Sequence, residues 1–160
     1  MRPGPRTVQA MGALCAVAIL VPLVPFLEWA LVAGIVALAG AVAFERRALR
    51  KVRVTHEEPP AFVLSLDEEE TVAFRLATDA ARPVRLTVRR PWPRLVAQAS
   101  TTLRGVCRPG ETLPLSCTVR GIQRGSARLE GPHVALTFSG WAERIVSVEV
   151  KSELTVLPNL

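Results

Sequence analysis

Two apolar stretches near the start of the chain, residues 8–20 and 29–44, limit what it can fold into. A proline-containing break separates them, and its Glu28 is the one charged side chain between Met11 and Phe44. A membrane-spanning helix needs about 17–25 apolar residues. Extension to Leu23 brings the first stretch close to this length, and extension back to Phe26 brings the second within it. Because backbone polar groups must bond internally in lipid, we predict a two-helix transmembrane hairpin over residues 1–50.

A cleaved signal peptide is the alternative interpretation, because Arg2 and Arg6 precede the first apolar stretch. The second apolar stretch follows at once, however, and ends in a basic cluster typical of a stop-transfer segment. No clear small-x-small cleavage site separates the two stretches. The hairpin is therefore favoured, and an exported binding domain behind a cleaved signal remains the alternative.

The net charge of +6 is concentrated beside the apolar stretches. Residues 1–53 carry seven basic side chains and two carboxylates, whereas residues 54–160 carry thirteen and twelve. Basic residues that flank membrane spans stay on the cytoplasmic side, and attraction of the cluster at 46–53 to anionic lipid reinforces this orientation. We expect a multi-pass protein of the cell membrane whose domain after residue 50 is cytoplasmic. That domain has no basic stripe interleaved with aromatics, so no nucleic-acid partner is expected.

From residue 51 onward, apolar and polar residues alternate in short segments, which is typical of strands with one buried face. Turn residues separate these segments, and no tract has a helical pattern. The spacing predicts an antiparallel immunoglobulin-like β-sandwich over residues 51–160. Pro114 lies inside one predicted strand and indicates an edge or a bulge. The side chains expected in the core include Phe74, Leu86, Cys117, Val134, Leu136 and Val148.

Signatures of catalysis and metal binding are missing from the sequence. It contains two histidines and three cysteines, with no C-x-x-C, H-E-x-x-H, G-x-S-x-G or G-x-x-x-x-G-K-[ST] motif. We therefore expect no cofactor, no metal and no catalytic residue. A hydrolase or transferase that uses Glu57, Glu58 or His133 is the weaker alternative, because no nucleophile–base pair can be recognised.

A disulfide between Cys107 and Cys117 is not expected. If Pro109-Gly110 is a hairpin turn, Cys107 faces about Thr112 and Cys117 faces about Thr102. Direct cross-strand partners lie about 4.5–5.5 Å apart, and the two cysteines would be several residues out of register. Cytoplasmic thiols also stay reduced, so Cys117 is interpreted as a core residue.

Two predicted loops place large aromatic side chains in exposed settings, one of them beside arginines. Arg89-Arg90-Pro91-Trp92-Pro93 forms one loop, and Gly140-Trp141 belongs to the other. Such residue types anchor protein interfaces, and the prolines limit the entropy lost on docking. Alternatively, both indoles close the ends of the sandwich. The candidate partner-binding residues are Arg89, Arg90, Trp92 and Trp141.

The order of these features resembles a known bacterial family. A two-span hairpin leads through a basic segment into a β-domain that contains Arg124–Pro132 and closes with Glu153–Leu160. This layout and these two segments resemble the N-terminal region of the family called domain of unknown function fifty-eight. Its patterns there are R-G-x-(Y/H)-x-L-G-P and E-L-x-V-x-P-x-L.

Two departures from the family pattern are visible. The family's D-P-x-G-L turn keeps only its glycine, at Gly140, and the family's von Willebrand factor A-like module would begin where the sequence stops. The chain is therefore either a fragment or a stand-alone relative, and the family's metal-site residues have no counterpart in it. The resemblance implies a place beside MoxR-type ATPases and transglutaminase-like membrane proteins. We expect a membrane-tethered, non-catalytic interaction or scaffold module that acts with the lipid bilayer and such an ATPase or a neighbouring membrane protein.

Overall fold

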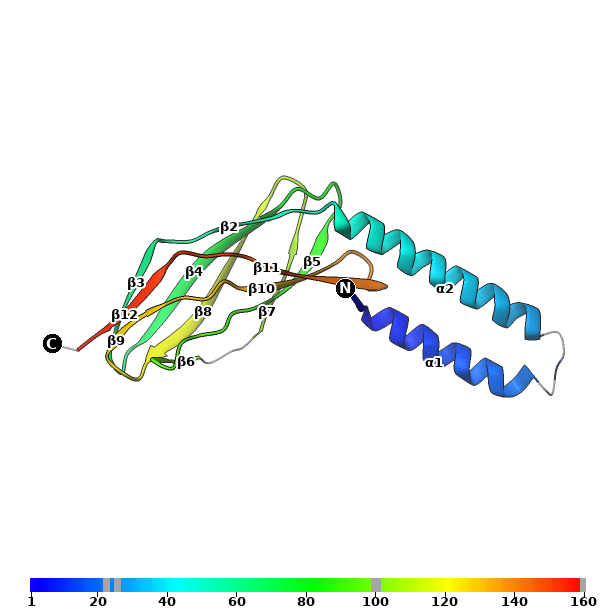
Figure 1. Ribbon diagram of the computed structural model, residues 1–160, viewed down its shortest axis with the longest axis horizontal. Coiled ribbons are helices and arrows are strands. Elements are labelled where there is room, and N and C mark those ends of the chain that lie inside the picture. The colour runs from blue at the N-terminus through cyan, green and yellow to red at the C-terminus, as the bar shows by residue number, and fades with distance from the viewer. Residues whose placement is uncertain (22–23, 25–26, 99–101, 159–160) are drawn as a thin grey trace. The chain divides into compact units, whose positions relative to one another are not determined.

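The computed structural model describes residues 1–21, 24, 27–98 and 102–158, which form two compact units (Figure 1). The first unit contains Met1–Val52 and Leu136–Ile145. The second contains Arg53–Ala135 and Val146–Leu160. The hairpin around residue 140 therefore belongs to the same unit as the N-terminal helices.

Two helices make up most of the first unit. α1 spans Pro5–Leu20 and α2 spans Leu27–Arg50, and the two lie side by side (Figure 1). A Cβ on Gly34 would lie 2.7 Å from Leu14 Cδ2, so this glycine permits the close contact between them. The predicted pair of helices is present, while residues 22–23 and 25–26 of the predicted turn lie outside the described residues.

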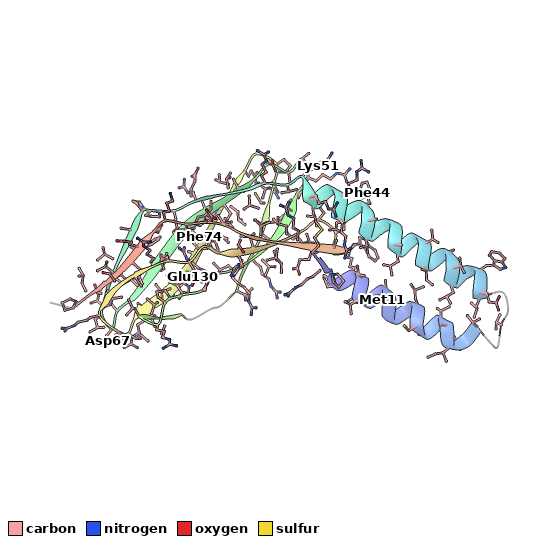
Figure 2. The ribbon with its side chains drawn as sticks, viewed as in Figure 1. Met11, Phe44, Lys51, Asp67, Phe74 and Glu130 are labelled. Carbon is pink, nitrogen blue, oxygen red and sulfur yellow. The ribbon has the colours of Figure 1, made fainter. Side chains whose placement is uncertain are left out.

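Within the described ranges, α2 alone is long and apolar enough to cross a membrane. Its 24 residues extend about 36 Å, whereas the 16 residues of α1 extend about 24 Å, less than the hydrocarbon thickness of about 30 Å. Met11 and Phe44 show how the apolar side chains of both helices project outward (Figure 2). One apolar N-terminal helix of spanning length fits a membrane span and a signal peptide alike, and the multi-pass arrangement stays a prediction.

The second unit is a β-sandwich, as the alternating pattern predicts (Figure 1). The strands of the chain form three sheets, with the orders β2-β4-β8-β6, β3-β12-β9 and β1-β11-β10-β5-β7. The strands are β1 (Arg2–Pro3), β2 (Val54–Glu57), β3 (Ala61–Ser65), β4 (Glu69–Thr78), β5 (Val84–Arg89), β6 (Val96–Gln98), β7 (Leu103–Cys107), β8 (Thr112–Gly121), β9 (Gly125–Arg128), β10 (His133–Thr137), β11 (Ala142–Ser147) and β12 (Glu153–Leu157).

The sandwich is not wholly antiparallel, which corrects the prediction. β12 runs parallel to β3, with Leu154 opposite Phe62 and Val156 opposite Leu64, and antiparallel to β9. Strands so far apart in sequence have no tight turn that forces an antiparallel pairing, and a long connection permits the parallel one. Alternation reports which face of a strand is buried, but it carries no information about strand direction.

Most of the predicted core side chains are buried. Phe74 lies inside the second unit (Figure 2), and Leu86, Cys117, Val134 and Leu136 are buried as well. Val148 is the exception and is only half-buried. The reason is that β11 ends at Ser147, and the chain then leaves the ladder with Val148 N donating to Pro132 O at 3.1 Å.

The segment around Pro109-Gly110 is a turn, but it does not join two strands of one sheet. β7 pairs with β5 and β8 pairs with β4, so Cys107 lies opposite Val84 and Cys117 opposite Val72. The predicted hairpin register is therefore wrong, because this turn carries the chain from one sheet to another. Cys107 and Cys117 are buried free thiols.

Pro114 lies where β8 is paired on one side only among the described residues. It faces Arg75 of β4, whereas β6 pairs with β8 only at residues 119–121. A proline has no N–H for a second ladder, so it suits this position. The predicted edge character of the strand is confirmed for this half of β8.

Candidate functional site: the junction turn and the Arg90 cluster

The turn between β10 and β11 closes around the carboxylate of Glu45, which is 4% exposed. We call Phe138–Trp141 the junction turn. Glu45 Oε1 accepts hydrogen bonds from Thr137 Oγ1 at 3.0 Å and from the N–H groups of Phe138 and Ser139 at 2.8 Å. Glu45 Oε2 accepts from the N–H groups of Trp141 at 2.8 Å and Ala142 at 3.2 Å. Converging backbone N–H groups of this kind form an anion-binding nest, and here the anion is a side chain of the same chain.

Gly140 gives the junction turn its curvature. Its φ of 92° lies in a region that residues with a Cβ rarely adopt. In this conformation its N–H donates to Thr137 Oγ1 at 2.9 Å and lies 3.4 Å from Glu45 Oε1. Gly140 therefore has a structural role in the turn of this chain.

Arg144 caps the other end of the same contact. Its Nη1 lies within hydrogen-bond distance of the carbonyl oxygens of Leu49 (2.7 Å), Arg50 (3.1 Å) and Val52 (2.9 Å). These carbonyls lie in the last turn of α2 and just beyond it, where helical carbonyls lack intrahelical donors. A cation at this end also interacts favourably with the helix dipole. The β10–β11 hairpin thus offers α2 both a nest for Glu45 and a cap for its C-terminus.

The start of α1 binds the same turn. Gly4 N donates to Trp141 O at 3.0 Å, Arg6 N donates to Gly140 O at 3.0 Å, and Thr7 Oγ1 donates to Trp141 O. A Cβ on Gly4 would lie 2.1 Å from Gly140 O, so only glycine permits this approach. The N-terminus of α1 and the C-terminus of α2 are therefore held by one turn.

A second polar group of side chains, the Arg90 cluster, lies within the second unit and contains His56, Glu58, Arg90 and Trp92. Arg90 is 6% exposed, and it forms a bidentate ion pair with Glu58. The distances are 2.6 Å from Nη1 to Oε2 and 3.1 Å from Nη2 to Oε1. Paired donors of this geometry match a carboxylate and make a strong charge-assisted contact.

Aromatic rings surround the Arg90 guanidinium. Its Cζ lies 5.1 Å from the ring centroid of Trp92, 5.7 Å from that of Phe74 and 5.9 Å from that of Phe62. These distances fall within the range of cation–π attraction. The rings and the ion pair together account for the burial of a charged side chain that follows directly after β5.

The acid–base properties of the Arg90 cluster follow from burial and from its hydrogen bonds. Burial favours the neutral form of Glu58, but hydrogen bonds from His56, Arg90 and Ser152 outweigh it and lower the pKa of Glu58 to about 2. His56 Nε2 lies 2.8 Å from Glu58 Oε2. Burial raises the pKa of the Cys117 thiol, and the charge of Arg90 opposes that rise. Glu58 is therefore a fixed anion at neutral pH.

The four candidate partner-binding residues differ in exposure and are divided between the two units. Arg89 is exposed, Arg90 is buried, and Trp92 and Trp141 are half-buried. Arg90 and Trp92 pack together in the second unit, and the indole Nε1 of Trp92 is buried. Trp141 belongs to the first unit, where its backbone takes part in the junction turn. Burial removes Arg90 as an exposed anchor, and of the four residues only Arg89 has the exposure that a docking side chain needs.

The residues of the weaker, enzymatic alternative are also separate. Glu57 is exposed, Glu58 is paired with Arg90, and His133 Nδ1 lies 2.9 Å from Ser147 Oγ on the surface. In the described ranges, no group of three or more His, Cys, Asp or Glu side chains could hold a metal ion. Of these residues, Glu58 is engaged in an ion pair with Arg90, and His133 contacts the hydroxyl of Ser147 at the surface.

Sequence reasoning missed Glu45 and the ion pair that Glu58 makes. The sequence position of Glu45 could have indicated a specific contact, because it is a lone carboxylate between an apolar stretch and a basic cluster. Glu58 precedes Pro59-Pro60, and the sequence suggests it only as a residue of the weaker, enzymatic alternative. Its pairing with Arg90 joins residues 32 positions apart, which no local pattern reveals.

No protein-family model matches the chain, and no curated protein does. The similarity is to solved β-domains. Part of Escherichia coli alpha-2-macroglobulin, the segment from domain MG7 to the C-terminus, has a TM-score of 0.50 and 15% identity, with 67% of this chain and 16% of that chain covered. A PapD-like (ASH) domain of human CEP192 has a TM-score of 0.44 and 8% identity, covering 66% of this chain and 84% of that domain. The likeness to alpha-2-macroglobulin supports the β-sandwich fold and nothing more specific. The resemblance to the domain-of-unknown-function-fifty-eight family stays a prediction.

Proposed function

We propose that this protein is a non-catalytic interaction or scaffold module that α2 tethers to the cell membrane, with its β-sandwich in the cytoplasm. The observation that carries the proposal is the surface of α2. Over the apolar part of this helix, side chains as large as Trp29 and Phe44 are exposed. Exposed apolar area on this scale is costly in water and is favourable in a bilayer.

The cytoplasmic orientation is supported by the charges at the ends of the helices. Arg46, Arg47 and Arg50 lie at the C-terminal end of α2, and Arg2 and Arg6 lie beside the start of α1. The junction turn binds these same two ends, which fits helices that enter and leave the membrane on one side. Positively charged flanks favour the cytoplasmic side.

The partner in this proposal is a MoxR-type ATPase or a neighbouring membrane protein, as the family resemblance implies. Within the sandwich Arg90 pairs with Glu58 and packs on Trp92, so a partner would be contacted by other, exposed side chains. Arg89 is the candidate contact that remains exposed.

Topology is tested with a reporter fused after Leu160 that is active only in the periplasm, together with membrane fractionation. We expect the full chain in the membrane fraction after a carbonate wash, with a silent reporter and an active cytoplasmic counterpart. A strong periplasmic signal would overturn the orientation and favour the exported domain. Recovery of a shortened, soluble chain would identify a cleaved signal and overturn the tether.

The partner is tested by pull-down of the MoxR-type ATPase with the full chain in detergent. Arg89→Glu reverses an exposed charge and is expected to reduce capture at least fivefold without a change in thermal midpoint. Arg82→Glu, a charge-matched change at another exposed position, is the control and is expected to have no effect. Equal capture by both variants would remove Arg89 from the interface. No capture by the unmodified chain would refute this partner.

A further inference from the structure

One face of α2 combines a groove with three arginines. The groove has a volume of about 590 Å³, and its lining residues recur at intervals of three and four positions, so they share one side of the helix. We call these residues the basic face: Ala39, Val42, Ala43, Arg46, Arg47 and Arg50. Small apolar side chains form its first half and guanidinium groups its second half.

The charges of the basic face are not neutralised within the described ranges. Arg46, Arg47 and Arg50 are exposed, and the ion pairs found there involve other residues. Glu45 is their nearest carboxylate in sequence, but both of its oxygens are occupied by the junction turn. The basic face therefore has three positive charges available for an external anion.

We propose that the basic face binds an acidic phospholipid, with the headgroup phosphate on the arginines and an acyl chain along Ala39, Val42 and Ala43. This inference rests on the proposed membrane position of α2. Residues 39 to 50 extend about 16 Å, so the face runs from the apolar part of the helix to its charged end. A forked guanidinium matches a phosphate better than an ammonium does. The apolar end of the face thus matches the acyl chain of a phospholipid, and its positively charged end matches the headgroup phosphate.

A specific site differs from diffuse attraction of the whole basic cluster. Lys51 and Arg53 belong to the same cluster in sequence, but they do not line the groove. Diffuse attraction depends on the net charge near the membrane and would treat all five basic residues alike. A bound lipid would depend on Arg46, Arg47 and Arg50 far more than on the other two.

The test uses the full chain purified in detergent and compares retention of dioleoylphosphatidylglycerol and dioleoylphosphatidylcholine by native mass spectrometry. The double variant Arg46→Gln/Arg50→Gln is expected to lose retention of phosphatidylglycerol roughly tenfold. The charge-matched double variant Lys51→Gln/Arg53→Gln is expected to change it less than twofold. Conservative Arg46→Lys/Arg50→Lys keeps the charge and is expected to lose an intermediate amount, because the forked contact is lost.

Three other outcomes would contradict or narrow the proposed lipid site. Equal losses in the two glutamine variants would show diffuse attraction and overturn the site. Equal retention of both lipids by the unmodified chain would also overturn it. Displacement of phosphatidylglycerol by inorganic phosphate alone would indicate a phosphate site without acyl recognition. Because membrane fractionation of each variant is measured separately, failure of lipid selectivity is distinguishable from failure of the tether.

Discussion

Two buried carboxylates are stabilised in different ways. Glu45 is bound mainly by backbone N–H groups of the junction turn, whereas Glu58 is bound by the Arg90 guanidinium. Neither side chain is available for proton transfer, since each is surrounded by donors that favour its charged form. Both buried carboxylates therefore join segments that lie far apart in the sequence.

The low pKa of Glu58 predicts acid sensitivity. The folded-state pKa of about 2 lies below the ordinary value of 4.5, so Glu58 contributes stability above pH 4.5 that is lost as the pH falls toward 2. The contribution is up to about 3 kcal/mol. We expect Glu58→Gln to lower the free energy of unfolding at pH 7 and to flatten its decline between pH 4.5 and 2, as measured by urea denaturation in detergent. Exposed Glu57→Gln is the control. Parallel pH curves for Glu58→Gln and the unmodified chain would contradict this account.

Replacement of Glu45 should loosen the junction turn. In Glu45→Ala the N–H groups of residues 138–142 lose their acceptor, and each unpaired buried donor costs about 1–3 kcal/mol. We expect hydrogen exchange in a peptide covering 137–142 to accelerate at least tenfold. Glu28→Ala removes the other carboxylate of α2, which is exposed, and should leave exchange unchanged. Unchanged exchange in Glu45→Ala would show that the carboxylate does not hold the turn.

At the level of elements, sequence alternation predicted the long strands well and the short ones poorly. β4 and β8 each bury every second side chain over much of their length, so their apolar–polar alternation is easy to recognise in the sequence. β6, β7 and β9 have three to five residues each, and β9 buries none of its side chains fully. Their positions depend on pairing with distant strands, which local pattern does not encode. For the candidate site, residue types alone suggested that Arg90 and Trp92 are exposed. Their burial depends on Glu58, which lies far away in sequence and could not be recognised as the partner of Arg90.

Gly131 connects β9 and β10 at a point where the backbone of another segment passes very close. A Cβ on Gly131 would lie 1.5 Å from Val148 O, a backbone atom that cannot move as a side chain does. We expect Gly131→Ala to lower the free energy of unfolding by more than about 2 kcal/mol in urea titration. Gly40→Ala, where a Cβ would meet nothing within 4 Å, is expected to be neutral or slightly stabilising. A neutral Gly131→Ala would show that the two segments are not held this close.

At the scale of the whole molecule, the division into two units does not follow the order of the chain. The first unit takes residues 136–145 from the β-rich region and joins them to the N-terminal helices. A boundary drawn near residue 50 from composition separates the apolar from the alternating sequence. Composition does not show that the junction turn belongs with the helices, because the hydrogen bonds of Glu45 and Arg144 hold them together.

The Glu45 contact also sets an order of events during synthesis. The carboxylate leaves the ribosome 92 to 97 residues before the groups that bind it. At 5–20 residues per second, this interval is roughly 5–20 seconds. During that time Glu45 lies near the end of a completed helix without the groups that bind it, and the nest forms only after residue 142 has been synthesised. A ribosome that stalls before residue 142 therefore leaves a chain whose two helices are complete but whose ends are not yet joined by the junction turn.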